Sequence, residues 1–347
     1  MSQSVKVEQW SSKLGVVLAV AGSAVGFGNF LRFPGLAAQH GGGAFMLAYF
    51  CSLLLLGIPL CWIEWSLGRK AGTMGGHSVV AAYHLLTKSR LWKYAGILSL
   101  LTPLTLGMYY FYIEGWTLGY TYHMLMGDLN FDSPAGFGHF FAQFAGLEAN
   151  GAAFDLEKTK VIIFFFIAIL MNCALLFLGV SKGIERFCKW SMPMLIGIAV
   201  LLTIRVLTLG TPDAAHPNRN VNEGLGYMWN PDKVVLQVDG KTIDMVPSDY
   251  TEEQTNSLIT QVQKNYPSQE VQAVNIGFIA GLMNPDVWVA AAGQIFFSLS
   301  VGFGTVMTYT SYVRRDEDIA LSSLSANASN EVVEVGIAGR MIVPAAV

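Results

Sequence analysis

The chain has 347 residues, of which 53% are hydrophobic and only 13% charged, and its formal net charge is −3. Soluble domains carry roughly 25% charged residues, so this composition, with a mean hydropathy of +0.45, excludes an ordinary soluble protein. No run of basic residues is longer than two, which argues against a nucleic-acid partner.

Seven apolar segments are each long enough for the roughly 20 residues that a helix needs to cross a bilayer. They cover residues 14–37, 43–67, 94–126, 160–179, 188–209, 287–312 and 322–347. The sequence therefore predicts an all-α polytopic membrane protein with a single transmembrane domain over residues 1–347. The four cysteines lie in or beside these segments without the spacing of metal ligands, and we expect them to serve packing.

The first long loop, residues 127–159, has phenylalanines at helical spacing within 137–147. This spacing predicts an amphipathic helix on the outer surface.

The second long loop, residues 210–286, contains an insertion at about 233–283. Residues 233–246 alternate around Asp239-Gly240, which predicts a β-hairpin, and the stretch from Thr251 to Gln254 is a capping-box pattern that opens a short helix. We expect a solvated insertion that does not take part in the function of the transmembrane domain; a regulatory role is the alternative.

The distribution of Lys and Arg predicts the orientation in the membrane. Twelve of these residues lie on the side of the N-terminus, and eight are spread over the longer loops of the opposite side. By the positive-inside rule the N-terminus is cytoplasmic, and we expect a multi-pass protein of the cytoplasmic membrane.

One tetrapeptide occurs twice, as Val25-Gly26-Phe27-Gly28 and as Val301-Gly302-Phe303-Gly304, each time inside an apolar segment. Glycine pairs interrupt helices, and an interruption inside a bilayer is tolerated where the freed backbone groups line a cavity or bind a ligand. The two copies run in opposite directions, five segments apart. This arrangement is typical of transporters built as inverted repeats, here of five helices each. The second repeat would need about three more helices, so we expect the fold to be truncated after about seven transmembrane helices.

The residues around each interruption suit ions and zwitterions. Unwound carbonyls and the side-chain oxygen of Asn29 suit a hard cation, and the N-terminus of the following half-helix suits a carboxylate. Ser298 and Ser300 bring two hydroxyls to the second interruption. Gly22 and Gly26 could instead form only a helix-packing motif, but the second copy favours a binding site.

Seven stretches of the chain resemble the neurotransmitter:sodium symporter family. The matching stretches are Trp10-(x)₄-Gly15 with residues 22–34 and 41–45, then residues 57–69, 109–116, 294–304 and 312–316. The resemblance covers most of residues 8–347 apart from roughly 233–283. It implies sodium-coupled uptake by alternating access, with the amino acid and sodium bound near the midplane of the membrane.

The resemblance implies two sodium sites. The residues that match the first are Ala24, Asn29, Ser298 and Asn330. Gly22 and Val25 match backbone ligands of the second site, whose other ligands belong to an eighth helix that this chain lacks. The second site is therefore expected to be incomplete here.

The resemblance also implies a substrate site. The matching positions are Ala24, Phe27, Gly28, Tyr110, Phe297, Ser298, Ser300 and Phe303. Monoamine-transporting members carry an aspartate where this chain has Gly26, so the resemblance favours an amino acid, which brings its own carboxylate. The aromatic positions favour an apolar or aromatic side chain.

Glu334 lies four residues after Asn330, on the same helical face. A carboxylate inside a membrane helix is costly and indicates function. In chloride-dependent members a neutral residue stands at this position, near the counterparts of Tyr49, Gln294 and Ser298. Glu334 would supply the negative charge itself, which predicts chloride-independent transport; a carboxylate merely paired with a nearby cation is the alternative.

Further residues match gates or supports of the family. Arg32 matches the outer gate, and Trp10 belongs to the inner one, whose usual arginine is replaced by Val7. Glu64 and Glu114 are expected to hold the broken helices through hydrogen bonds. We have no interpretation of Arg340.

These observations predict a sodium-coupled symporter of a neutral, hydrophobic or aromatic amino acid. The alternative is an amino-acid sensor, or an inactive fragment, on the same scaffold. An enzyme is not indicated, because the chain has neither a Gly-x-Ser-x-Gly motif nor a membrane metal motif.

Overall fold

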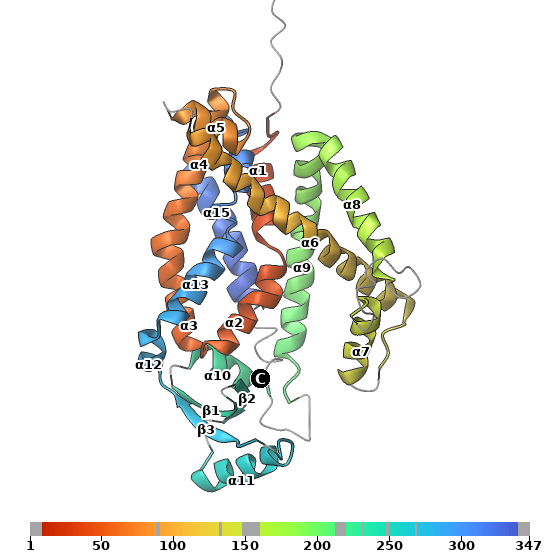
Figure 1. Ribbon diagram of the computed structural model, residues 1–347, viewed down its shortest axis with the longest axis vertical. Helices are drawn as coiled ribbons and strands as arrows, with labels where there is room; N and C mark the ends of the chain where they lie inside the picture. Colours follow the sequence, from red (N-terminus) through yellow and green to blue (C-terminus); the bar gives the residue numbers. More distant parts are fainter. Residues whose placement is uncertain are drawn as a thin grey trace, which may run out of the picture.

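The computed structural model describes residues 9–87, 91–131, 134–147, 160–211, 220–230, 232–239, 241–247, 250–267 and 269–338. These residues are mostly helical, and a small sheet lies at one end of the molecule (Figure 1). The predicted all-α architecture is confirmed for the segments that bury most of the apolar core, whereas the sheet belongs to the second long loop.

The first predicted span is a broken helix. α1 (Lys13–Ala24) begins at Ser12, whose side chain caps the helix by accepting a hydrogen bond from the Gly15 amide. A π-helical segment (Gly28–Arg32) and α2 (Phe33–Gln39) follow the interruption, and the two halves are bent by 48°.

The second predicted span is continuous. α3 (Gly43–Ser52), a π-helical segment (Leu53–Gly57) and α4 (Ile58–Thr73) form one 31-residue helix. It is followed by α5 (Val79–Leu86), a short helix that the sequence analysis missed; Ser78 caps it.

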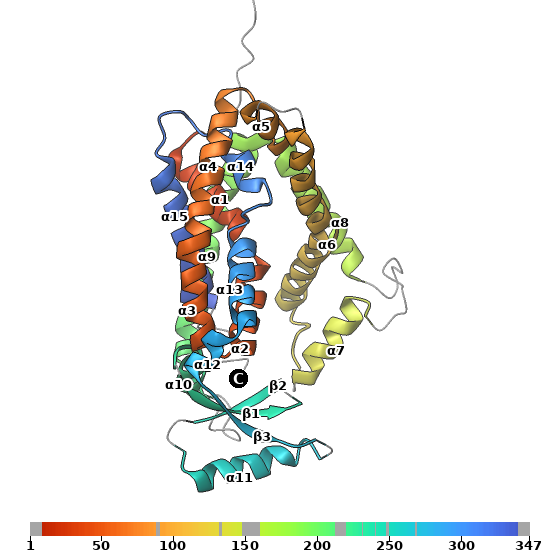
Figure 2. The same ribbon diagram turned by 60° about the vertical axis from the view of Figure 1, so that its left-hand side comes forward.

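Three helices of the middle of the chain stand apart from the central bundle (Figures 1 and 2). α6 (Trp92–Met126) packs along α8 (Val161–Phe177), and α7 (Pro134–Phe144) covers their outer ends through aromatic contacts. The helix expected within 137–147 is therefore present, shifted by about one turn. A π-helical segment (Val180–Glu185) then leads into α9 (Arg186–Leu207), which packs against α1.

The second long loop folds into a compact unit, which we call the outer unit because the orientation predicted from the sequence places it outside. Its elements are α10 (Val221–Trp229), β1 (Lys233–Val238), β2 (Lys241–Val246), α11 (Glu252–Gln263), β3 (Gln272–Ile276) and α12 (Phe278–Met283). The hairpin and the capping box are confirmed, with β1 antiparallel to β2 and Asp239 at a positive φ of 49° in the turn. The strand β3, which the sequence analysis missed, pairs with the other edge of β1, so the sheet order is β2-β1-β3.

The second broken helix lies beside the first. α13 (Pro285–Ser298) packs against α3, and α14 (Thr305–Thr310) packs against α4. α15 (Ile319–Glu331) continues as a π-helical segment (Val332–Ala338) and packs against α1 and α4. The first broken helix runs toward the sheet and the second runs away from it, as the inverted repeat predicts (Figure 2).

Within the described residues, length and composition alone identify three helices that could cross a membrane, or four if the bent first pair counts as one span. The other three predicted spans do not meet these length and composition limits within the described residues. α8 has 17 residues, the sixth span is interrupted, and the seventh is described only as far as Ala338. Arg340 and Val7 lie outside the described residues.

Candidate functional site

The two interruptions face each other in the centre of the helix bundle. The first covers residues 25–27 and the second residues 299–304. The Ser300 hydroxyl donates to the Ser23 carbonyl at 3.1 Å, and the Gln294 amide nitrogen donates to the Gly28 carbonyl at 3.2 Å. Segments more than 260 residues apart are thus joined at the interruptions, through the Ser23 carbonyl near the end of α1 and the Gly28 carbonyl at the start of the next helical segment.

The second interruption has a left-handed backbone. Ser300, Gly302 and Gly304 have φ values of 53°, 85° and 77°. Such values are uncommon for a non-glycine residue, and strained backbone of this kind persists where the surroundings hold it in place. Glu64 from α4 provides that support, because its Oε1 accepts a hydrogen bond from the Gly302 amide at 2.7 Å.

The expected role of Glu114 is corrected by the structure. Its carboxylate accepts a hydrogen bond from the Asn172 amide at 2.7 Å, so it joins α6 to α8 rather than holding a broken helix.

A fully buried polar cluster lies beside the two interruptions. Its members are Asn29, Gln294, Ser298, Asn330 and Glu334, none of them more than 1% exposed. They come from the first broken helix, from α13, and from α15 with its π-helical continuation. Buried polar groups are costly unless they are hydrogen-bonded, so this cluster must be satisfied internally or by a ligand.

Glu334 is the acceptor at the centre of this cluster. Its carboxylate accepts hydrogen bonds from Asn29 Nδ2 at 2.8 Å, from Gln294 Nε2 at 2.6 Å and from Asn330 Nδ2 at 3.3 Å. The Ser298 hydroxyl donates to it as well. Among the described residues no ion pair includes Glu334, which disfavours the alternative of a directly paired carboxylate.

Neutral oxygens from three helices converge next to this carboxylate. Asn29 Oδ1 accepts from the Gly26 amide at 2.8 Å, and Asn330 Oδ1 accepts from Asn29 Nδ2 at 2.9 Å. Asn330 Nδ2 in turn donates to Ser298 Oγ at 2.7 Å. Ala24 is the last residue of α1, so its carbonyl has no partner within that helix. Side-chain amide and hydroxyl oxygens are ligands that hard cations take, so the oxygens of Asn29, Ser298 and Asn330 fit Na⁺.

The two residues matched to the second sodium site take different positions. Gly22 packs against α9, where an added Cβ would lie 3.4 Å from Met192 Sδ and 3.6 Å from Cys188 Sγ. Val25 is the buried first residue of the interruption and has an extended backbone.

The aromatic residues matched to the substrate site surround the first interruption. The Phe27 and Tyr110 rings meet edge-on at 6.5 Å, and the Tyr110 hydroxyl lies 3.2 Å from where a Cβ of Gly26 would be. A Cβ on Gly28 would lie 2.5 Å from the Phe297 ring, so only glycine allows this approach. Phe303 lies in the second interruption and is half-buried.

Arg32 and Tyr49 connect the cluster to its surroundings. The Arg32 guanidinium donates to Gln294 Oε1 at 2.5 Å and lies 5.3 Å from the centre of the Phe297 ring. The buried Tyr49 hydroxyl donates to Glu331 at 2.9 Å. The sequence analysis missed Glu331, although it directly follows Asn330 in the same span.

Comparison with known proteins decides the family. The model of the sodium:neurotransmitter symporter family matches residues 7–211 and 268–344. The chain belongs to this symporter family. Its relatives and structural neighbours are transporters and not enzymes.

Relatives of the symporter family match along nearly the whole chain. A sodium-dependent transporter of Haemophilus influenzae is 27% identical over 97% of this chain and 60% of its own length, and YhdH of Bacillus subtilis is 28% identical over 98% and 60%. The rat sodium-dependent neutral amino acid transporter B(0)AT1 is 26% identical over 88% of this chain and 41% of its own length.

The crystal structure of MhsT in complex with L-phenylalanine matches with a TM-score of 0.72 and 30% identity, over 98% of this chain and 61% of MhsT. The chain therefore spans about three fifths of the length of MhsT and of the two bacterial relatives.

The symporter family model leaves out residues 212–267, which include α10, β1, β2 and α11. This part of the outer unit distinguishes the chain from the family pattern. At the opposite end, Trp10 is buried, and its indole Nε1 donates to the Tyr309 carbonyl at 2.8 Å, which ties the start of α1 to α14.

Proposed function

We propose that this chain forms the binding core of a symporter that couples sodium entry to uptake of a neutral, hydrophobic or aromatic amino acid. The observation that carries the proposal is the pair of facing interruptions with neutral oxygens and a buried carboxylate between them. Such an arrangement offers ligands to a cation and to a zwitterion at the same place. Transport by alternating access then exposes this place first to the outside and then to the cytoplasm.

Sodium binds through the oxygens of Ala24, Asn29, Ser298 and Asn330. The amino acid binds through the unwound backbone at Phe27 and Gly28 and through the Tyr110 hydroxyl, and its side chain lies among Phe27, Phe297 and Phe303. Gly26 supports an amino acid over an amine, because it brings no carboxylate of its own. The L-phenylalanine complex of MhsT and the name of B(0)AT1 support a neutral substrate.

Transport is proposed to be chloride-independent. Glu334 already supplies a negative charge beside the oxygens that fit sodium, and it is held by donors from three helices. An additional anion there would meet like-charge repulsion in a site of low dielectric constant. The protein lies in the cytoplasmic membrane with its N-terminus inside.

Uptake of labelled amino acids into proteoliposomes tests the proposal, on the 347-residue chain and on a longer form that reaches the length of its relatives. Sodium should drive uptake, potassium should not, and replacing chloride with gluconate should leave the rate unchanged. A panel of twenty competing amino acids should identify hydrophobic or aromatic competitors. Amino-acid binding without uptake in either form would indicate a sensor instead, and uptake that stops in gluconate would refute chloride independence.

The sodium ligands are tested by Asn330→Ala, with Asn327→Ala as the matched control. Both asparagines lie in α15, but Asn327 contacts Cys61 of α4 at 3.6 Å and stands outside the cluster. Losing one ligand hydrogen-bonding group costs about 1–3 kcal/mol, so Asn330→Ala should raise the half-saturating sodium concentration about tenfold or more. An equal effect of both variants would show that helix packing, not sodium binding, was disturbed.

A further inference from the structure

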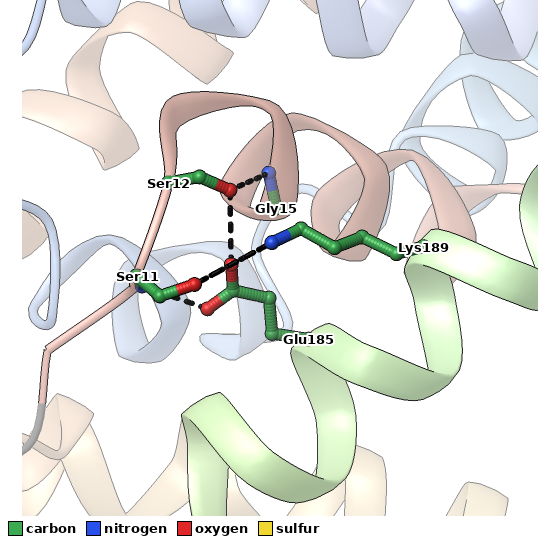
Figure 3. A network of polar contacts seen from close by, with 5 residues as sticks. All are labelled: Ser11, Ser12, Gly15, Glu185 and Lys189. Atoms are coloured by element: carbon green, nitrogen blue, oxygen red, sulfur yellow. Dashed lines mark hydrogen bonds and ion pairs between the residues drawn. The ribbon is translucent and has the colours of Figure 1, made fainter.

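The N-terminus of α1 is fastened to a buried carboxylate at the junction of α8 and α9 (Figure 3). Glu185 ends the π-helical segment before α9 and is 1% exposed. Its partners are the two serines that precede α1 and a lysine one turn further along its own helix. We call the set Ser11, Ser12, Gly15, Glu185 and Lys189 the Glu185 clasp.

Four donors converge on this carboxylate. Glu185 Oε2 accepts from the Ser11 amide at 2.8 Å, and Oε1 accepts from the hydroxyls of Ser11 at 2.5 Å and Ser12 at 3.0 Å. Lys189 Nζ donates to Oε1 at 2.6 Å. Hydrogen bonds to a buried charge are the stronger kind, so the contact between the two helices is substantial.

The Glu185 clasp includes the residue that caps the N-terminus of α1. Ser12 caps α1 by accepting from the Gly15 amide at 3.1 Å, so one hydroxyl both starts α1 and binds Glu185. A Cβ on Gly15 would lie 2.2 Å from Glu185 Oε1, so α1 approaches the carboxylate as closely as a glycine allows. Because of this approach, α1 cannot leave α9 without separating Glu185 from three of its four donors.

The same segment is held on its other side by Trp10, whose indole donates a hydrogen bond to the Tyr309 carbonyl in α14. The start of α1 therefore lies between the inner half of the second broken helix and the beginning of α9. In a transporter that works by alternating access, opening the cytoplasmic side requires the inner half-helix α1 to move away from these neighbours. Lys189 would stay with Glu185 during that movement, since the two are one turn apart on one helix.

We propose that Glu185 is a positioning residue that locks α1 against α9 and holds the cytoplasmic side of the transport path closed. The lock opens when Ser11 and Ser12 leave the carboxylate and cytoplasmic water replaces them, while Lys189 remains as its counterion. This inference rests on the proposed function, because it assigns Glu185 to one of the two states that alternating access requires.

Cys188 is a native reporter of this movement. It is partly buried on α9, with its Sγ 3.6 Å from the position of a Cβ on Gly22 of α1, so separation of α1 from α9 would expose it. Cys173 lies in α8, away from this contact, and serves as the internal reference. The rate of maleimide labelling from the cytoplasmic side can be measured for each cysteine by peptide mass spectrometry in inside-out vesicles.

Glu185→Gln should accelerate labelling of Cys188 about tenfold and leave Cys173 unchanged, because the neutral amide keeps the shape but loses a charged hydrogen bond. Gly15→Ala should act in the same direction by pushing α1 away. Combining it with Glu185→Gln should add less than the sum of the two effects, because both act on one contact. Arg186→Gln, which removes an exposed charge from the next residue, should leave Cys188 labelling at the wild-type rate.

Unchanged Cys188 labelling in both Glu185→Gln and Gly15→Ala would overturn the proposal, as would equal acceleration at Cys173. If Glu185→Gln does not yield a monodisperse protein, Ser11→Ala, which keeps the carboxylate, is measured with Gly15→Ala under the same criterion. The labelling does not need transport. If the wild-type protein shows no sodium-driven uptake but Glu185→Gln still accelerates Cys188 labelling, the proposed function is refuted. The role given to the Glu185 clasp is then retained.

Discussion

At the scale of single residues, the arrangement around Glu334 shows how a membrane protein can keep a buried carboxylate without a directly paired cation. Its neighbours are amides and a hydroxyl, each donating one hydrogen bond to it. Donors that converge on one point suit any anion. If the carboxylate were removed, the same donors would remain buried and lack an acceptor, which is energetically unfavourable.

Glu334→Ser should therefore make transport depend on chloride, because a chloride ion could occupy the vacated space among the donors. The expected result is sodium-driven uptake that is near wild type in chloride and falls at least about tenfold in gluconate, the effect of about 1.4 kcal/mol. Wild-type protein in both media is the control. Equal uptake by the variant in the two media would contradict the role given to Glu334.

The sequence was informative about Glu334 because it lies one helical turn from Asn330 and its position matches the family. The same criterion, a carboxylate inside a predicted span, also pointed to Glu331, which was nevertheless missed; it holds Tyr49. Glu185 holds the start of α1, but it lies between two predicted spans, where an acidic residue is ordinary. Their partners are more than 170 positions away along the chain, so only the packing of the helices reveals them.

At the scale of elements, long apolar segments and local turn signals were predictable, and short elements were not. The hairpin and the capping box are encoded within a few residues and are present. Strand β3 depends on pairing with β1, which lies more than thirty residues earlier, and its sequence does not alternate strongly. The helices α5 and α12 have only 8 and 6 residues, too few for a helical period to be recognised.

The outer unit is attached to the bundle through Tyr227 of α10, which contacts a buried lysine. Lys233 begins β1, and its Nζ donates to the Tyr227 carbonyl and lies 4.3 Å from the centre of the Tyr227 ring. The Tyr227 hydroxyl donates in turn to the Ala38 carbonyl in α2. Burial lowers the pKa of Lys233 from its ordinary value of 10.5 to about 8.

This lowered pKa predicts a pH dependence of stability. Between pH 8 and about 10 the unfolded chain binds more protons at this lysine than the folded chain, so its contribution to stability rises with pH. Lys233→Met should remove that contribution, so the melting temperature of the variant should gain less than that of the wild type between these pH values. Lys264→Met, at an exposed position of the same unit, is the matched control. An equal gain in melting temperature over this pH range for wild type and Lys233→Met would refute the prediction.

At the scale of the whole molecule, the outer unit and α5 lie at opposite ends of the helix bundle (Figure 1). The positive-inside rule assigns the α5 end to the cytoplasm. The inverted course of the two broken helices was predictable from the repeated tetrapeptide. The position of α6 and α8 beside the bundle was not predictable, because nothing local in their sequences specifies which helices they pack against.

Orientation can be measured with a membrane-impermeant thiol reagent on intact cells. Asn256→Cys, at an exposed position of α11, should be labelled directly, whereas Lys70→Cys, at an exposed position near the end of α4, should react only after permeabilisation. Site-specific peptide analysis separates these cysteines from the four native ones. Labelling of Lys70→Cys alone in intact cells would reverse the proposed topology.

The sheet is joined to the outer halves of both broken helices. A single residue, Gly277, separates β3 from α12, and Asn284 alone separates α12 from α13, while Tyr227 bonds the end of α2. Under the proposed function these half-helices rearrange during the transport cycle, so the outer unit, most of which lies in the segment absent from the family pattern, is coupled mechanically to moving parts. A fluorophore pair placed on α11 and on the exterior end of α9 would consequently register each turnover from the aqueous side, without a label near the bound solutes.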